Sequence, residues 1–219
     1  MTTLSKEAVR ATLARHIPLY RWYPPRYQLA MLEALAEVWE GPHQHLLDIG
    51  GGTGIIAQVL QDHLPAGRVT AIDVENRFLP NLSIDTLTYD GVKLPFADAS
   101  FDAATINNVL HHVPVQGRKP LFAEIRRVVR GPLYIKDHLS RGRLDDARLA
   151  ALDWIGNTPF KGMVRADYLA AGEWAELARH AGYRIEPGPR KIWRRGPFAL
   201  LFPNRLETVM KWMPQQAAH

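Results

Sequence analysis

A short apolar run that leads into four glycines constrains the fold of this chain more than any other feature of its sequence. Residues 46–54 read LLDIGGGTG, with one carboxylate, Asp48, inside the apolar run. The next residues, 55–64, have the spacing of a helix. Glycines this dense occur where a backbone turns sharply or passes close to another group. The segment therefore predicts a buried strand, a tight turn that can hold a ligand, and a helix.

The sequence around this turn alternates between strand and helix patterns. Helical spacing is found at 26–40, 55–64 and 117–130, and strand patterns lie at 45–49, 68–73, 85–90, 101–109 and 131–138. Such alternation indicates a parallel sheet covered by helices on both faces. Ligands of such sheets bind beyond the carboxyl ends of the strands. Residues 139–170 break the alternation, and we interpret them as an insertion over the top of the sheet.

Composition excludes several classes of protein. The 219 residues suffice for one domain with a full core, and the hydrophobic and charged fractions of 47% and 22% are those of a globular protein. There is no cysteine, which excludes disulfides and thiolate sites. The sequence has no transmembrane run and no signal-peptide pattern, so we expect a cytoplasmic protein.

The net charge of +5 is concentrated near the C-terminus. Residues 190–219 hold six lysines and arginines against one acid, Glu207, and this excess of five equals that of the whole chain. The remainder is neutral and has no basic stripe interleaved with aromatic residues. Nucleic acid is therefore not expected as a partner.

Three ligands compete for the glycine turn. A triphosphate loop requires Lys and Ser or Thr after the last glycine, but Ile55 follows Gly54. A dinucleotide fingerprint is satisfied by Gly52, Gly54 and Ala57, with Asp73 in the place of the ribose-binding acid. The third pattern is acid-x-Gly-x-Gly-x-Gly, which suits a nucleoside that carries an amino-acid tail. A tight turn without a ligand is the structural alternative.

The following residues favour the third ligand. The stretch YDGVKLPFADASFDAATINNVLHHV, residues 89–113, has an acid at a strand end, then Leu-Pro-Phe, then Ser-Phe-Asp before another strand. Together with LLDIGGGTG and with AIDV at 71–74, it closely resembles the class I S-adenosylmethionine-dependent methyltransferases, in particular those that modify small molecules. The resemblance covers roughly residues 44–138, and it carries four motifs in the family's order.

The resemblance implies a Rossmann-like α/β fold with a seven-stranded, mostly parallel sheet and helices on both faces. In this family the last strand is antiparallel and lies between strands five and six. Residues 183–187 and 190–202 are expected to supply strands six and seven. The chain 1–219 would form a single methyltransferase domain, with residues 1–42 as a helical lid. About eleven residues join the second and third strands, so the helix usual at that place must be short or irregular.

The resemblance also implies a binding site for S-adenosylmethionine. The glycines would pass under its methionine and ribose parts, braced by Asp48, and Asp73 would accept hydrogen bonds from the ribose hydroxyls. Val74 would lie against the adenine and Asp90 would bind its amino group. The full set of expected cofactor residues is Asp48, Gly50, Gly52, Gly54, Asp73, Val74, Asp90, Gly91, Asn107 and Asn108. In the structural alternatives, Asp73 only caps the start of a helix or turn, and Asp90 with Gly91 only forms a tight turn.

Methyl transfer to oxygen or carbon usually requires a base on the acceptor side. His138 lies at the end of the fifth strand, and we predict it as this base, supported by Asp137 or Asp153. His112 is the next candidate. The alternative is a buried polar cluster that ties the insertion to the sheet. Aspartates at 137, 145, 146 and 153 could hold a divalent metal, but their spacing does not support predicting one.

The sequence thus predicts a small-molecule methyltransferase that acts on oxygen. One alternative is a C-methyltransferase that acts on an isoprenoid quinone or lipid. It depends on the basic and apolar C-terminal tail lying on a membrane surface. We favour a different interpretation of that tail, in which it forms an edge strand and a docked helix. Another is a partner subunit that binds the cofactor without catalysis. The acceptor and the oligomeric state do not follow from the sequence.

Overall fold

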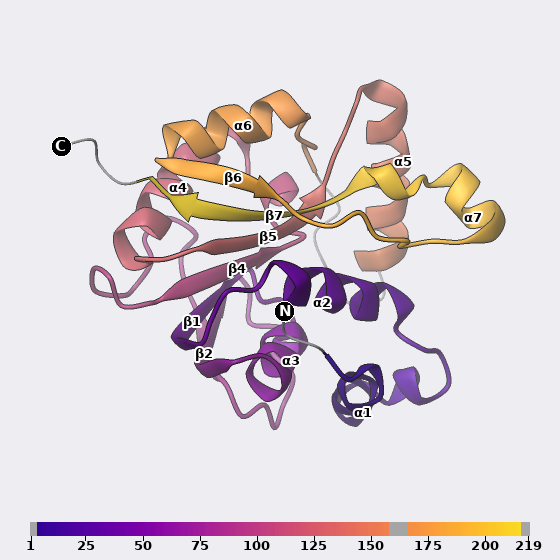
Figure 1. The fold of residues 1–219 in the computed structure, drawn as a ribbon, viewed down its shortest axis with the longest axis horizontal. Helices are drawn as coiled ribbons and strands as arrows, with labels where there is room; N and C mark the ends of the chain where they lie inside the picture. The colour runs from indigo at the N-terminus through magenta and orange to yellow at the C-terminus, as the bar shows by residue number, and fades with distance from the viewer. Residues whose placement is uncertain (1–3, 158–165, 216–219) are drawn as a thin grey trace.

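A seven-stranded sheet forms the centre of the computed structural model, which describes residues 4–157 and 166–215. The strand order is β3-β2-β1-β4-β5-β7-β6 (Figure 1). The first five strands pair in parallel, whereas β7 runs antiparallel to both β5 and β6. The strands are β1 (His43–Ile49), β2 (Ala66–Asp73), β3 (Asp85–Thr88), β4 (Ala103–Asn107), β5 (Leu133–His138), β6 (Tyr183–Pro187) and β7 (Glu207–Pro214). The predicted fold class is confirmed, including the antiparallel strand between strands five and six.

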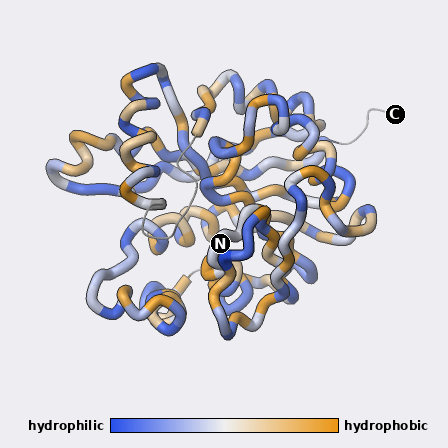
Figure 2. Tube along the Cα trace, turned by 180° about the vertical axis from the view of Figure 1, so that it is seen from behind, coloured by the Kyte–Doolittle hydropathy of each residue, from blue (hydrophilic) through white to orange (hydrophobic). Residues whose placement is uncertain are grey.

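Helices cover both faces of this sheet. One layer holds α1, α2 and α3, and the opposite layer holds α4 and α6, while α5 and α7 lie beyond the edge at which β5 ends (Figure 1). The helices are α1 (Lys6–His16), α2 (Arg26–Val38), α3 (Ile55–His63), α4 (Val115–Val128), α5 (Arg143–Asn157), α6 (Ala171–His180) and α7 (Gly196–Leu201). Single 3-10 turns are η1 (Pro18–Arg21), η2 (Leu110–His112) and η4 (Asn204–Leu206). Hydrophobic and hydrophilic stretches alternate along the covering helices (Figure 2).

Two hydrophobic cores follow from the alternation of side chains along the strands. Leu46 packs into the core beneath α1, α2 and α3, and its neighbour Leu47 packs into the core beneath α4 and α6. Both are fully buried. Burial of one such side chain stabilises the fold by roughly 1.5–3 kcal/mol. The central strands are therefore anchored on both faces, which fixes where their carboxyl ends lie.

The prediction that residues 190–202 form strand seven was wrong. Gly196 has a φ of +61°, and Pro197 stands in the first turn of α7, so this stretch bends into a short helix. The seventh strand is instead 207–214, where Glu207 lies opposite His138 of β5. This strand lies between β5 and β6, so residues 207–214 of the tail are inside the sheet and not at its edge.

The link between β2 and β3 was expected to hold a short or irregular helix, and the structure shows no helix there. Residues 74–84 form bends and turns that pack on the glycine turn, and the Leu79 amide donates to the Thr53 carbonyl over 2.9 Å. In the part of the chain that the structure describes, the expected insertion at 139–170 contains α5. Residues 158–165 of the insertion lie outside the described residues.

Candidate active site

The glycine turn joins β1 to α3 at the carboxyl edge of the sheet. Gly50, Gly52 and Gly54 all have positive φ, of +70°, +56° and +77°, which side chains rarely adopt. A Cβ atom on Gly50 would lie 2.4 Å from a methyl of Val109, and one on Gly54 would lie 2.6 Å from a methyl of Leu82. A Cβ on Gly52 would meet nothing within 4 Å. Side chains therefore pack closely against Gly50 and Gly54, whereas the space next to Gly52 is open.

Asp48 lies directly under this turn and is buried. Its Oδ1 accepts a hydrogen bond from the Thr105 hydroxyl at 2.5 Å and one from Asn107 Nδ2 at 3.3 Å. Burial raises the pKa of the Asp48 carboxyl to about 7, against the opposing effect of these two donors. The buried Oδ1 of Asn107 has no hydrogen-bond partner among the described residues. An acidic group and a vacant acceptor side by side suit a cationic ligand group such as an ammonium.

Asp73 ends β2 and faces the same turn. Its Oδ2 accepts from the Gly52 amide at 2.7 Å, its Oδ1 accepts from the Glu75 amide at 3.1 Å, and Arg77 lies 3.5 Å from Oδ1. Asp73 therefore orders the turn directly, and no helix begins beside it for it to cap. This carboxylate is within reach of a ligand that lies on the glycines.

The residues expected around the adenine come from two strand ends. Val74 is exposed for a valine, at 43%, and a Cβ built on Gly91 would lie 3.2 Å from its Cγ1, so these two residues are neighbours. Asp90 is exposed, and its Oδ1 accepts from the amides of Val92 and Lys93 at 2.8 and 3.1 Å. These two bonds lower the pKa of the Asp90 carboxyl.

Asn108 belongs to a buried network beside the glycine turn. Its φ is +55°, and its Oδ1 accepts from Lys136 and from the hydroxyl of Tyr27. Lys136 Nζ is fully buried and lies 2.5 Å from Glu207 Oε2, and Arg194 also pairs with Glu207. Lys136, Glu207, Tyr27 and Arg194 were not singled out from the sequence. The one signal for them was Glu207, the only acid in a basic tail.

The N-terminal segment reaches this network through Tyr27 at the start of α2. The Tyr27 hydroxyl lies 3.2 Å from Glu207 Oε2, and Lys136 Nζ lies 4.6 Å from the centre of the Tyr27 ring. Trp22 and Tyr23, in the segment predicted as a lid, are mostly exposed at 82% and 69%. The lid itself stays a prediction.

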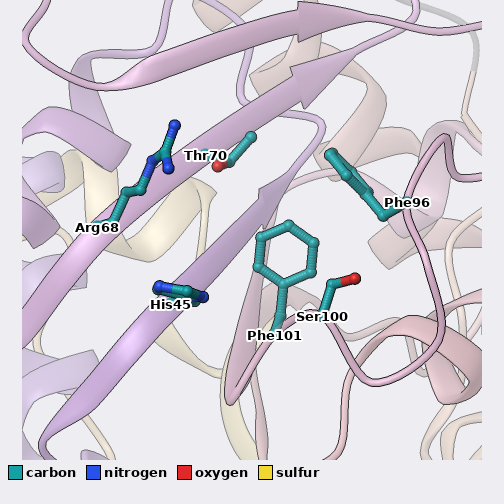
Figure 3. Close-up of a pocket in the computed structure, with 6 residues that line it drawn as sticks. All are labelled: His45, Arg68, Thr70, Phe96, Ser100 and Phe101. Carbon is teal, nitrogen blue, oxygen red and sulfur yellow. The ribbon is translucent and has the colours of Figure 1, made fainter.

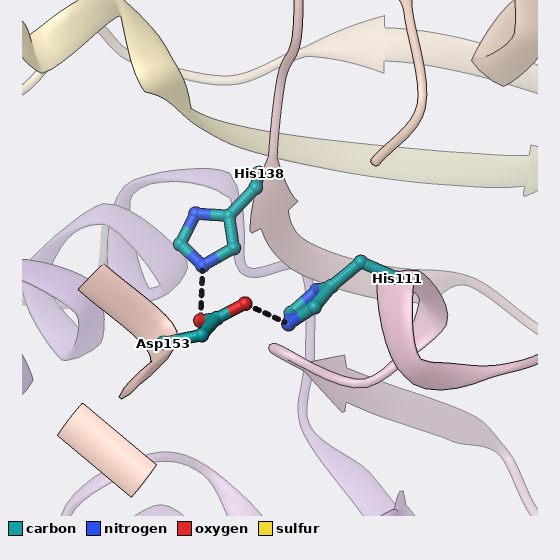
Figure 4. A group of neighbouring side chains, drawn as sticks. All are labelled: His111, His138 and Asp153. Carbon is teal, nitrogen blue, oxygen red and sulfur yellow. Dashed lines mark ion pairs between the residues drawn. The ribbon is translucent and has the colours of Figure 1, made fainter. Parts of the chain in front are cut away.

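A second polar cluster lies at the ends of β4 and β5, where acceptor chemistry was expected. His111 of η2, His138 of β5 and Asp153 of α5 point toward one another (Figure 4). Asp153 Oδ1 lies 3.3 Å from His138 Nε2, and Asp153 Oδ2 lies 3.4 Å from His111 Nε2. Of the two carboxylates expected to support His138, Asp153 therefore contacts its ring. Asp137 pairs with His111 Nδ1 instead.

Electrostatics in this cluster follow from burial and close pairing. Burial lowers the pKa of His138, but Glu207 and Asp153 outweigh it and raise that pKa to about 9. Burial opposes ionisation of Glu207, yet Lys136, His138 and Arg194 hold the pKa of its carboxyl well below the usual range. In the same way, His111 and His138 hold the pKa of the Asp137 carboxyl below its usual value despite burial.

The other predicted acceptor-side residues are arranged differently. His112 packs against His111 with the two rings tilted and their centres 4.1 Å apart. Asp145 pairs with Arg205 and Arg148, away from the two histidines. Within the described residues, the group of side chains that could hold a metal ion is His111, His138 and Asp153. Asp137 and Asp145 are outside that group.

A cavity of about 230 Å³ opens at the opposite edge of the sheet (Figure 3). It is lined by His45, Arg68, Thr70, Phe96, Ser100 and Phe101. His45 and Arg68 stand near the amino ends of β1 and β2. Ligands of parallel sheets bind beyond the carboxyl ends, so this cavity is not the candidate active site.

A comparison with known protein families finds a match to the central part of the chain. Residues 47–132, from the end of β1 to the start of β5, match the methyltransferase domain family Methyltransf_11. This segment of the chain is therefore similar to a methyltransferase domain. It includes the glycine turn, Asp73, Asp90 and the end of β4, which are the motifs that carried the resemblance in the sequence.

Two curated relatives match part of the chain. The ubiquinone/menaquinone biosynthesis C-methyltransferase UbiE of Paracoccus denitrificans is 40% identical over 106 residues, which are 42% of this chain and 41% of the relative. An uncharacterized methyltransferase of Mycobacterium avium is 33% identical over 147 residues, 56% of each. The chain thus spans about half the length of the curated relatives it matches.

Solved structures share the fold of this chain over most of its length. A chain in the complex between the Haloferax volcanii Trm112 methyltransferase activator and the putative methyltransferase has a TM-score of 0.68, at 15% identity, over 99% of this chain and 100% of that one. The magnesium protoporphyrin IX methyltransferase of Synechocystis, with bound SAH, has a TM-score of 0.54, at 15% identity, over 80% and 75%. At these identities the likeness establishes the fold.

Proposed function

We propose that this protein is an S-adenosylmethionine-dependent methyltransferase that acts on a small molecule. The observation that carries the proposal is the group beneath the open glycine turn, where buried Asp48 lies beside the vacant Oδ1 of Asn107. The methyl donor presents an ammonium group that suits both acceptors. The bound SAH of the structurally similar Synechocystis enzyme supports the same ligand. A cytoplasmic location is part of the proposal.

When bound, S-adenosylmethionine supplies an electrophilic methyl group on a sulfonium. The chain's own residues hold and orient it: Asp48 and Asn107 take the ammonium end, and Asp73 accepts from the ribose hydroxyls while it fixes the Gly52 amide. Val74 and Gly91 offer an apolar surface at the adenine end. Alignment of donor and acceptor is the main catalytic task in such a displacement.

The acceptor is proposed to be an oxygen, with its proton removed at the cluster of His111, His138 and Asp153. In this cluster His138 is the predicted general base, and Asp153 contacts its ring. Because the pKa of His138 is raised to about 9, only its deprotonated fraction can take the proton, and that fraction grows as the pH rises toward 9. The cluster is buried at the end of β5, beside the strand end that carries Asn107. Water is therefore largely excluded from the groups that would take the proton.

Calorimetry with S-adenosylmethionine, SAH and NAD tests the cofactor assignment. We expect heat from the first two ligands and none from NAD, because no dinucleotide-specific feature beyond the glycine spacing and Asp73 is found in the described part of the chain. Binding of NAD without binding of S-adenosylmethionine would overturn the proposal.

A second candidate function, C-methylation of a quinone or lipid, is favoured by the partial similarity to UbiE and by one surface. Three apolar side chains of α7, Phe198, Leu200 and Leu201, are exposed at 47%, 80% and 58%, next to the exposed Arg195. Such a surface suits an anionic membrane. Co-sedimentation with anionic liposomes that salt reverses, and that Leu200→Ser reduces, would favour this function. No effect of liposomes is expected if the acceptor is a water-soluble molecule.

A further inference from the structure

The cluster at the end of β5 has a composition that its role as a proton acceptor does not require. His111, His138 and Asp153 come from three separate elements, and each is more than nine-tenths buried. One ligand atom from each lies within 4.8 Å of the other two. Two imidazoles and one carboxylate form a ligand set used by catalytic zinc and by other divalent transition metals.

The separations inside the cluster fit metal ligands better than hydrogen bonds. The carboxylate of Asp153 lies 3.3 Å from His138 Nε2 and 3.4 Å from His111 Nε2. Charge-assisted N–H···O bonds are shorter, about 2.7–2.9 Å. Two ligands about 2.1 Å from a tetrahedral ion are roughly 3.4 Å apart. Moreover, His111 Nε2 is buried and has no hydrogen-bond partner among the described residues.

A carboxylate stands behind each imidazole, on the side away from Asp153. His111 Nδ1 pairs with Asp137, and His138 Nδ1 lies 3.1 Å from Glu207 Oε2. The Tyr168 hydroxyl donates to Asp153 Oδ2 over 2.5 Å. Histidines that bind metals almost always donate their second ring N–H to a carboxylate or carbonyl, which aims the other nitrogen at the ion. His111 has that outer partner, whereas His138 Nδ1 lies close to Glu207 without forming a hydrogen bond with it.

We propose that His111 Nε2, His138 Nε2 and the Asp153 carboxylate bind a divalent transition metal ion, with zinc as the first candidate. Imidazole ligands favour such ions over magnesium. The inference deepens the proposed function and rests on it for its catalytic meaning: the ion would lower the pKa of an acceptor hydroxyl, and His138 would then be a ligand instead of the base. Metal binding itself does not depend on the methyl donor.

Metal titration of the full chain, after removal of metals with EDTA, tests the proposal. We expect one Zn²⁺ per chain by calorimetry, one Co²⁺ with visible absorption bands, and much weaker binding of Mg²⁺. Asp153→Asn and His111→Ala should each lower zinc affinity at least about 100-fold, and Asp137→Asn should lower it about 10- to 100-fold through its outer position. His180→Ala, at an exposed histidine of α6, is the matched control and should change nothing.

Binding of S-adenosylmethionine, measured on the same samples, reports the fold and separates the two proposals. Zinc that binds wild type no more tightly than Asp153→Asn, while both bind the methyl donor, overturns the metal site alone. Zinc bound at one equivalent and lost in Asp153→Asn, without binding of the methyl donor, supports the metal site and overturns the proposed function. Absence of both overturns both.

Discussion

Replacement of Asp48 by asparagine should stabilise the ligand-free protein and weaken its binding of the methyl donor. Burial raises the pKa of the Asp48 carboxyl from 3.8 to about 7. The folded chain therefore pays to ionise this group, and the penalty is absent at low pH and complete once the pH has risen through about 7. Asparagine keeps an oxygen to accept from Thr105 and Asn107 and carries no charge.

The size of the effect follows from the pKa difference. About three pKa units at 1.36 kcal/mol each set an upper limit of about 4 kcal/mol for the gain in unfolding free energy at pH 8. At pH 5.5 the ionisation penalty has built up only over the interval from pH 3.8 to 5.5, so the upper limit of the gain falls to about 2 kcal/mol. The same change removes a charged partner of the ammonium group, which should weaken S-adenosylmethionine binding by about 1.5–3 kcal/mol, or about 10- to 150-fold.

Urea unfolding at pH 5.5 and pH 8, with calorimetry at pH 8, measures both effects of Asp48→Asn. Asp98→Asn is the matched control, because that side chain is 78% exposed and its replacement should shift the unfolding free energy by less than about 0.5 kcal/mol. A variant that is no more stable than wild type at pH 8, and that binds the methyl donor equally well, would refute the reasoning about this carboxylate.

Three further outcomes follow from the site. Asp73→Ala should weaken S-adenosylmethionine binding about 10- to 150-fold in calorimetry, since the ribose loses its acceptor and the Gly52 amide its partner; unchanged affinity would remove Asp73 from the site. Lys136→Met should lower the unfolding free energy in urea by about 3–5 kcal/mol, and Glu207→Gln in the same chain should recover part of it; an unchanged value would mean that the pair is solvated. Once an acceptor is found, His138→Ala should reduce turnover about 10²–10⁴-fold with cofactor affinity intact, and wild-type turnover would exclude His138.

The turn and its surroundings could be predicted from local sequence because their cause is local. Positive φ at Gly50, Gly52 and Gly54 is a property that glycine permits, and the strand and helix on either side have their own periodicity. The link between β2 and β3 was predicted without a regular helix from its length alone. The position of strand seven could not be predicted in the same way, because two apolar stretches of the tail competed and tertiary pairing with β5 selected 207–214.

The partners of buried charged groups depend on contacts between distant parts of the chain. Lys136 meets Glu207 across 71 residues, and His111 meets Asp137 across 26. Nothing in the local pattern assigns Asp137 to His111 and Asp153 to His138. By itself the sequence determined the order of elements, the glycine turn and the sheet edge at which that turn lies, because these follow from backbone conformation and periodicity. Only the tertiary structure decided which charges face one another, because a buried charge takes the partner that packing brings to it.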